Sequence, residues 1–413
     1  MRNASRSIGA VLGCVILFSA SCVFAQDWPQ WRGANRDGKV TGFTAPQTWP
    51  KALTQKWKVT VGSGDSTPAL VGDKLYVFAR QGDDEVTVCL NVADGKEVWK
   101  DKYATPSFSG PASRLHLGPR SSPAVADGKV VTLGVNGVVS CLDAATGKVA
   151  WRKDSAKEGF PGLPTFHTGM SPLIVDKMAI VQLGSEGNGA ILAYDLGTGE
   201  QKWKWAGEGP MYASPALLTA EGAKQVVTLT SKSIVGVGLT DGKLLWQVPF
   251  APTGMSYNAA TPIVDGQTIY VSGAGRGTKA LKIEKKDAGF AATELWSNDK
   301  LAVQFNTPVL KDGLLFGLTD KGSFFCINAK DGKEAWTDSA KRSRGFAAVV
   351  DAGSVLLGLP DNSELVVFKP SDKELAEVAK IKVADTATYA HPVIAGNKVF
   401  VKDQDAVALL TIE

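Results

Sequence analysis

The sequence carries little net charge, which excludes one broad class of function. Its 413 residues include 45 Lys and Arg against 41 Asp and Glu, for a formal charge of +4. Arg2 and Arg6 lie in an N-terminal segment that we expect to be removed, so the mature chain is closer still to neutrality. A nucleic-acid-binding surface requires a clear basic excess, and we therefore exclude that class.

Residues that carry common catalytic chemistry are also scarce. The three His residues, His116, His167 and His391, do not have the spacing of metal ligands, and the Gly-x-Ser-x-Gly elbow of serine hydrolases is absent. Gly273-x-Gly275-x-Gly277 lies between expected strands and opens no helix, so it does not indicate a dinucleotide site. No later segment holds 18 consecutive apolar residues, and we expect no transmembrane span in the mature chain.

The N-terminus has the features of an export signal. A short basic start precedes the apolar run Ile8–Phe24, and residues 23–25 place small side chains at the −3 and −1 positions before Gln26. We predict a signal peptide over residues 1–25 and a mature protein in the periplasm or outside the cell. The alternative is an outer-membrane lipoprotein attached through Cys22, although the residues before Cys22 lack the usual Leu.

A repeated unit organises the rest of the sequence, and residues 122–154 show it most plainly. Four short segments rich in β-branched residues are separated by the dipeptides Asp127-Gly128, Asn136-Gly137 and Thr146-Gly147. Asp-Gly and Asn-Gly favour two-residue hairpin turns because both central residues need positive φ. Four strands joined by hairpins form one blade of a β-propeller, which is the all-β fold that we predict.

The unit recurs at intervals typical of propeller blades. In seven copies a Pro opens the first strand: Pro68, Pro123, Pro172, Pro215, Pro262, Pro308 and Pro392. In an eighth, degenerate copy Ala348 takes the place of this Pro. Most copies close with Gly-x-x-x-Trp, at Gly95/Trp99, Gly147/Trp151, Gly199/Trp203, Gly242/Trp246 and Gly332/Trp336. We expect the Trp of each outermost strand to cover the seam with the next blade and to donate its N–H to a carbonyl. This structural docking set is Trp57, Trp99, Trp151, Trp203, Trp246, Trp296 and Trp336.

The two ends of the repeat array complement each other. The last copy, from His391 to Ile412, supplies only three strands, whereas residues 55–61 supply a single outer strand. We predict that this N-terminal strand completes the C-terminal blade and closes a ring of eight four-stranded antiparallel blades. Seven blades are the alternative, if residues 347–383 do not form one. The predicted domains are a lead-in over residues 26–54 and one propeller over residues 55–413.

Three Cys residues remain in the mature chain, and all three fall at one position of the repeat. Cys89, Cys141 and Cys326 belong to different blades, which places their Cα atoms beyond the reach of a disulfide. We therefore interpret them as small buried hydrophobic residues.

The repeat resembles a known family. Ala-Thr-Gly-Lys-Val-Ala-Trp at 145–151 and Asp-Gly-Lys-Glu-Val-Trp at 94–99 are similar to the tryptophan-docking repeat of pyrroloquinoline-quinone-type propellers, and the segment 27–38 resembles the lead-in of such quinoproteins. The family includes calcium-dependent quinoprotein alcohol dehydrogenases and a non-enzymatic lipoprotein that assists outer-membrane β-barrel assembly. The resemblance implies the fold, but it does not select between these activities.

The candidate site lies at the mouth of the central channel. Connections from each outer strand to the next inner strand gather at one end of the channel, so the residues before each opening Pro are candidates for binding a polar ligand or a partner peptide. They are Asp65, Arg120, His167, Tyr212, Asn258, Asn306, Arg344, Tyr389 and His391. The alternative is that they only solvate the mouth. The longest insertion, residues 101–121, is either a lid over the mouth or a surface loop.

Quinoprotein chemistry makes demands that this set does not meet. A calcium ion bridging the cofactor needs several oxygen ligands, and abstraction of an alcohol proton needs a carboxylate base. Asp65 is the one acid in the set, and the adjacent-Cys pair typical of these dehydrogenases is absent. We predict no cofactor, no metal and no catalytic residue. The expected function is a binding or scaffold protein of the bacterial cell envelope that interacts with a protein or peptide. The alternative is a quinone- and calcium-dependent dehydrogenase of alcohols or sugars.

Overall fold

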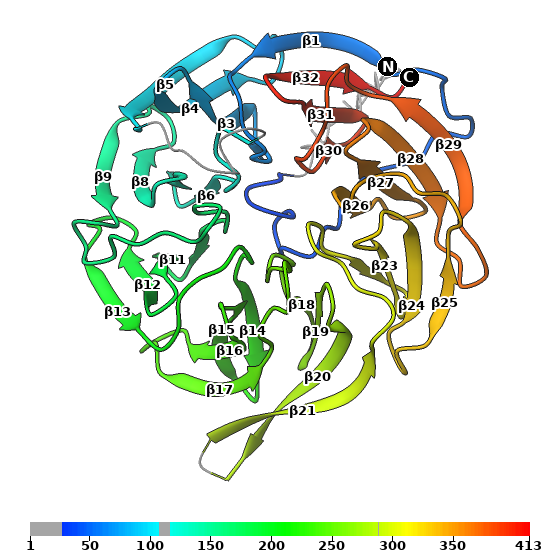
Figure 1. Cartoon of the computed structure of the whole chain (residues 1–413). Coiled ribbons are helices and arrows are strands. Elements are labelled where there is room, and N and C mark those ends of the chain that lie inside the picture. Colours follow the sequence, from blue (N-terminus) through cyan, green and yellow to red (C-terminus); the bar gives the residue numbers. More distant parts are fainter. Residues whose placement is uncertain (1–26, 107–115, 288) are drawn as a thin grey trace, which may run out of the picture.

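The computed structural model describes residues 27–106, 116–287 and 289–413. These residues form eight four-stranded antiparallel sheets arranged as blades around a central axis (Figure 1), which confirms the predicted eight-bladed propeller. The predicted signal peptide, Cys22 and residues 107–115 of the long insertion lie outside the described residues. No helix in the described part of the chain is long and apolar enough to cross a membrane.

The blades follow one another along the chain, and within each the strands run from the channel outward. Blade 1 contains β2 (Ala69–Val71), β3 (Lys74–Gln81), β4 (Asp84–Asn91) and β5 (Glu97–Ala104), and blade 2 contains β6 (Ala124–Ala126), β7 (Lys129–Leu133), β8 (Val138–Asp143) and β9 (Val149–Asp154). Blade 3 contains β10 (Leu173–Val175), β11 (Met178–Ser185), β12 (Asn188–Asp195) and β13 (Gln201–Trp205), and blade 4 contains β14 (Ala216–Ala220), β15 (Ala223–Leu229), β16 (Ser233–Gly238) and β17 (Leu244–Pro249). Blade 5 contains β18 (Ile263–Asp265), β19 (Thr268–Gly273), β20 (Gly277–Lys286) and β21 (Gly289–Asn298), and blade 6 contains β22 (Val309–Lys311), β23 (Leu314–Leu318), β24 (Phe324–Asn328) and β25 (Glu334–Thr337). Blade 7 contains β26 (Ala347–Asp351), β27 (Leu356–Pro360), β28 (Glu364–Lys369) and β29 (Ala376–Lys382), and blade 8 contains β30 (Val393–Ala395), β31 (Lys398–Lys402), β32 (Ala406–Thr411) and the N-terminal strand β1 (Thr54–Thr60).

Blade 8 joins the two ends of the described chain, as predicted. β1 pairs antiparallel with β32, with Trp57 opposite Leu409 and Thr60 opposite Ala406. The middle strands of the blades are buried on both faces because each sheet is covered by its two neighbours, whereas β5 and the other outermost strands alternate between exposed and covered residues. Closure leaves no blade with an uncovered apolar face.

Indole rings dock each blade against the next. In six of the eight blades the Trp Nε1–H donates to a backbone carbonyl of the following blade at 2.7–3.0 Å. The pairs are Trp57–Val92, Trp99–Ala144, Trp151–Leu196, Trp203–Leu239, Trp296–Ala329 and Trp336–Ser371. The Gly of the following blade lies on the indole face in five of these seams. Gly147, for example, has a φ of 73°, and a Cβ there would lie 2.5 Å from Trp99 Cε3.

Two blades depart from this pattern, each for a visible reason. Trp246 donates to Gln225 Oε1 within its own blade, because blade 5 extends the β20–β21 hairpin where other blades have the acceptor turn. That hairpin projects from the ring (Figure 1). In blade 7, Ala379 pairs with Val367 next to the same bulge that flanks each docking Trp. Trp49 from the lead-in packs against the same core cluster as Ala379 and supplies an indole to this seam.

The lead-in fills the central channel. Residues 27–40 occupy the middle of the ring (Figure 1), where Trp28 pairs with Leu70 and Val40 binds Asp351 through the backbone. Arg32 is fully buried and donates to Thr307 O and Pro308 O, both at 2.8 Å. Arg36, also buried, donates to Ser171 O, Pro172 O and Pro215 O on another side of the ring. We call residues 27–40 the plug.

A ring of hydroxyl groups joins the inner strands beside the plug. The residue before each opening Pro is Ser or Thr in six repeats and His391 in the seventh. In four of the six, and at His391, the N–H of this residue donates to the hydroxyl of the equivalent residue in the next blade. The bonds, at 2.9–3.0 Å, run from Thr67 to Ser122, Ser122 to Ser171, Ser171 to Ser214, Thr261 to Thr307, and His391 to Thr67. They fix the start of each inner strand and hence the loop before it.

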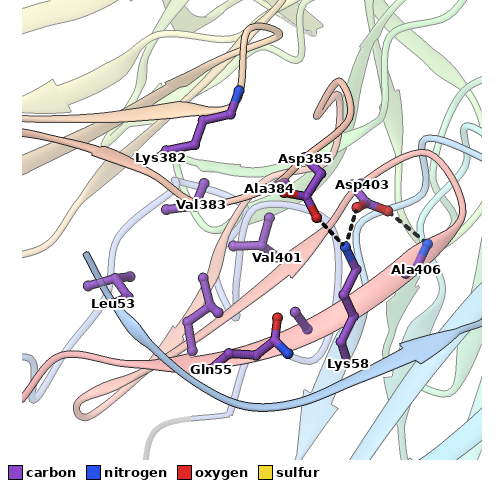
Figure 2. A pocket seen from close by; sticks show the side chains of 12 residues that line it. Leu53, Gln55, Lys58, Lys382, Val383, Ala384, Asp385, Val401, Asp403 and Ala406 are labelled. Carbon is purple, nitrogen blue, oxygen red and sulfur yellow. Dashed lines mark hydrogen bonds and ion pairs between the residues drawn. The ribbon is translucent and has the colours of Figure 1, made fainter.

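A small cavity remains at the seam between blades 7 and 8 (Figure 2). Its volume is about 170 Å³, and its apolar wall includes Val383 and Leu410. At its polar end, Lys58 Nζ lies 3.2 Å from carboxylate oxygens of both Asp385 and Asp403. Burial lowers the pKa of Lys58, but the two carboxylates outweigh burial and leave that pKa raised. Lys58 therefore links the closing strand β1 to both blades.

Candidate functional site at the channel mouth

The loops that precede the inner strands meet at one end of the channel, and their aromatic side chains contact one another there. Seven rings form a continuous series that we call the mouth arc: Phe166, Tyr212, Tyr257, Phe305, Phe346, Tyr389 and His116. Phe305 and Phe346 stack at 4.3 Å with an interplanar angle of 7°, Tyr257 and Phe305 stack more loosely at 6.4 Å, and the remaining contacts are edge-to-face at up to 6.4 Å. Each ring comes from a different loop, so the arc ties the loops together.

The predicted site residues divide into those that the arc includes and those inside the wall. Tyr212 and Tyr389 belong to the arc. Asn258 and Asn306 are buried, and their side-chain amides donate to backbone carbonyls, including Thr230 O at 2.8 Å and Leu318 O at 2.7 Å. These two residues hold the loops in shape, and that they contact a ligand stays a prediction.

His391 also lies inside the wall. It is 2% exposed, and its ring meets Trp31 of the plug edge-on at a centroid distance of 4.6 Å. Burial, with a smaller contribution from Arg32, lowers the pKa of His391 well below its usual range. Its Nδ1 has no hydrogen-bond partner within the described part of the chain.

The polar members of the predicted set gather on one side of the mouth. Asp65 Oδ2 lies 2.6 Å from His116 Nδ1, and both side chains are mostly buried. Arg120 donates to Phe166 O at 2.7 Å and to His116 O at 3.1 Å. Burial lowers the pKa of Arg120, and nearby Asp65 offsets this only in part.

His167 follows Phe166 in the same loop. It adopts a φ of 64°, and its Nδ1 lies 3.0 Å from Asn136 Oδ1. Burial first, and then Arg120, lower the pKa of His167. A positive φ costs a non-glycine residue roughly 1 kcal/mol, so the loop holds His167 in place against its backbone preference.

The opposite side of the mouth holds a hollow with two exposed apolar side chains in a largely polar lining. A pocket of about 350 Å³ lies between the loops before blades 5, 6 and 7, with Phe305 and Met255 in its lining. Met255 is 89% exposed and Phe305 37% exposed. Arg344, the ninth predicted residue, lines the rim of this pocket opposite Asp320.

Carboxylates are sparse at the mouth, where a calcium–quinone cofactor would need several oxygen ligands. Over residues 27–106, 116–287 and 289–413, no three His, Cys, Asp or Glu side chains are grouped so that they could hold a metal ion. Asp65 is hydrogen-bonded to His116 and has no second carboxylate beside it in that set. The Cys thiols are buried and free, and burial raises the pKa of each to about 12, so they are unreactive small side chains of the core.

Sequence reasoning missed most of the arc and, apart from Arg344, the residues that line the pocket. Phe166, Tyr257, Phe305 and Phe346 stand one to seven residues before their inner strands, at no fixed offset, because the loops differ in length. The available signal was an aromatic residue in nearly every one of these loops. Met255 carries no such signal, since a single Met in a loop is unremarkable until its exposure is known.

Comparisons with known proteins agree with the fold. A family model described as outer membrane protein assembly factor BamB matches residues 82–338, more than half of the chain. BamB of Burkholderia pseudomallei is 26% identical over 365 residues, covering 86% of this chain and 86% of that protein. Quinohemoprotein alcohol dehydrogenase of Comamonas testosteroni is 33% identical over 146 residues, which is 34% of this chain and 19% of that protein.

Solved structures extend the likeness of the fold. The crystal structure of BamB from Moraxella catarrhalis superposes with a TM-score of 0.65 at 15% identity, covering 87% of this chain and 100% of that chain. The Comamonas testosteroni quinohemoprotein alcohol dehydrogenase superposes with a TM-score of 0.71 at 14% identity, covering 95% and 81%. Similarity at this level of identity establishes the architecture alone.

Proposed function

This chain belongs to the family of the outer membrane protein assembly factor BamB, and on that basis we propose that it is a non-enzymatic scaffold protein of the bacterial cell envelope. It would bind another protein, or an extended peptide, with the loops at the channel mouth. The N-terminal export signal predicted from the sequence is consistent with this location, as are the BamB relatives by their names.

Two exposed apolar side chains in the pocket at the mouth are the observation that carries the proposal. Met255 and Phe305 expose large apolar side chains beside a hollow of about 350 Å³, with charged groups at its rim. Aromatic and Met side chains around a pocket, surrounded by polar groups, are typical of the centre of a protein interface. Phe305 is held by its ring contacts with Tyr257 and Phe346, so a partner would meet a side chain whose position is already set.

The rest of the channel supports binding over catalysis. The plug and the hydroxyl ring fill the axis, and the polar groups of the mouth are engaged with one another or with backbone carbonyls. Such an arrangement favours recognition by the outer surface of the loops.

Photo-crosslinking in the living cell tests the proposal directly. A photoreactive residue at position 255 or 117, both exposed in mouth loops, should capture one and the same envelope protein. The same residue at position 98, which is 44% exposed on the outer strand of blade 1, is the matched control and should not capture it. Equal capture from all three positions, or different proteins from 255 and 117, would contradict docking at the mouth.

A quinone-dependent dehydrogenase is the second candidate, because the lead-in and the repeat resemble those of quinoproteins. The test adds pyrroloquinoline quinone and calcium to the purified protein. Saturable quenching of Trp fluorescence together with dye reduction by alcohols or sugars would replace the scaffold proposal. We expect neither.

A further inference from the structure

We propose that Arg120 is a carboxylate-binding site, and that the ligand of the mouth presents an acidic group to it. If this ligand is the partner protein of the proposed function, the inference states that the partner presents a carboxylate. It also stands as a statement about this protein alone, because it rests on the surroundings of one guanidinium group.

The charge of Arg120 has no carboxylate partner. Its two hydrogen bonds, to Phe166 O and His116 O, go to neutral carbonyls, and no ion pair joins it to any described residue. The segments outside the description, residues 1–26, 107–115 and 288, contain no Asp or Glu, so they cannot supply the missing carboxylate. A mostly buried charge usually has an opposite charge beside it.

The nearest acid is already engaged. Asp65 is close enough to raise the pKa of Arg120, but its carboxylate is hydrogen-bonded to the imidazole of His116 at 2.6 Å. Buried cations elsewhere in the chain differ from Arg120 in their surroundings. Arg36 donates to three carbonyls inside the closed channel, whereas Arg120, though mostly buried, is partly exposed at the mouth.

A second donor lies beside the guanidinium. Tyr212 Oη accepts the N–H of Phe166 at 3.0 Å, and Arg120 binds the carbonyl of the same residue, so the two polar groups meet on one stretch of backbone. Tyr212 Oη–H donates to no acceptor in the described part of the chain. The guanidinium and the Tyr212 hydroxyl therefore keep unused donors, while the one carboxylate near them, Asp65, is bonded to His116, and this favours an anion over a cationic group.

The geometry of the guanidinium favours a carboxylate among anions. Arg has five N–H donors in a planar fork, and two are used by Phe166 O and His116 O. The remaining donors can pair with two carboxylate oxygens at once, an arrangement that a Lys ammonium does not reproduce. Two sources share this chemistry: a small organic acid, or an acidic residue or free C-terminus of a protein.

The experiment measures binding to the purified mature protein by calorimetry. The probes are succinate, Ac-Glu-Glu-Glu-Glu-NH2, Ac-Gln-Gln-Gln-Gln-OH and the neutral Ac-Gln-Gln-Gln-Gln-NH2, which separate a free acid, side-chain carboxylates and a terminal carboxylate. We expect at least one acidic probe to bind in a salt-dependent manner and the neutral peptide not to bind. Arg120→Gln should weaken the acidic probe by about tenfold to a hundredfold, the usual effect of losing a charge-assisted hydrogen bond.

Two further variants keep the test decisive if Arg120→Gln disturbs the loop. Arg120→Lys retains a donor to Phe166 O and the charge, so it should fold normally and bind more weakly than the wild type. Arg342→Gln is the matched control, because Arg342 already pairs with Asp338 and Glu377, and it should bind like the wild type. Unchanged affinity in both Arg120 variants, or equal binding of the neutral peptide, would overturn the proposal. Failure to crosslink a partner at position 255 would count against the scaffold function and leave this result untouched.

Discussion

Three buried cations in this protein, Arg32, Arg36 and Lys402, are held by backbone carbonyls. Arg32 and Arg36 donate to carbonyls at the starts of inner strands, and Lys402 Nζ donates to Gly64 O at 2.7 Å and Asp403 O at 3.0 Å. Burial lowers the pKa of Arg36 to about 9, so its charge persists at neutral pH. The carbonyl groups crowded around the channel therefore solvate these charges in place of water.

His391 is the group for which burial has the clearest consequence at acidic pH. The unfolded chain binds a proton at His391 near pH 6.5, whereas the folded protein does not until the pH is far lower. The unfolded state thus takes up more protons below pH 6.5, so the contribution of His391 to stability is complete above that pH and is lost as the pH falls below it.

Replacing His391 by Gln should remove this dependence. Between pH 7.5 and 5.5, urea unfolding should show that the wild type loses about 1 kcal/mol more than His391→Gln, the free energy of protonating one exposed imidazole. His167→Gln is the control and should change the dependence less, because its imidazole is only partly buried. Equal losses in the wild type and His391→Gln would show that His391 is protonated in the folded protein.

The Gly–Trp pair acts between blades, although the sequence presents it within one. Gly147 stands four residues before Trp151, yet its Cα lies on Trp99 of the preceding blade, where a Cβ would come within 2.5 Å of the ring. The positive φ of the turn and the close approach of the indole both require Gly here. Each Gly–Trp pair in the sequence therefore corresponds to packing between neighbouring blades, which is why the spacing of the pairs indicated the number of blades correctly.

Two Gly residues of blade 2 allow the cost of a positive φ to be measured apart from the cost of crowding the indole. Gly128 and Gly147 have φ values of 69° and 73°, but a Cβ at Gly128 meets open space. Gly128→Ala should cost about 1 kcal/mol from backbone strain alone. Gly147→Ala should cost about 1–3 kcal/mol more, because the methyl group must displace Trp99. Chemical denaturation of both variants measures the difference, and equal costs would mean that the seam is looser than the described packing.

Turn dipeptides and Trp spacing allowed the fold to be predicted, because both are local. In the degenerate copy, where these signals are weak, they gave an inaccurate alignment of the repeat. In blade 7 the strand register places Val349 at the position of the opening Pro, one residue after Ala348. The candidate site was less accessible to prediction, since the arc depends on which side chains of unequal loops meet above the plug. Arg36 contacts Pro215, 179 positions along the chain, and no sequence pattern marks that contact.

The plug connects parts of the ring that never touch one another. Arg32 binds residues before and at the start of blade 6, whereas Arg36 binds the starts of blades 3 and 4. Residues 41–53 then pass from the channel to the closing strand β1, so the lead-in contributes both to the centre of the ring and to its outer seam. The stability of the ring thus depends on the lead-in as well as on β1, the fourth strand of blade 8.

Arg36→Met tests this dependence for the whole molecule. The variant removes donors from three buried carbonyls, so we expect a loss of about 3 kcal/mol or more of unfolding free energy. We also expect chymotrypsin to cut at Trp28 or Trp31 under conditions in which the blades stay intact, because the plug leaves the channel before the sheets open. Lys39→Met is the control, since the Lys39 side chain is exposed and the plug pairs with Asp351 at this position through its backbone. If N-terminal sequencing shows equal cleavage in both variants, Arg36 is not what holds the plug, and the ring is stable without this link across its channel.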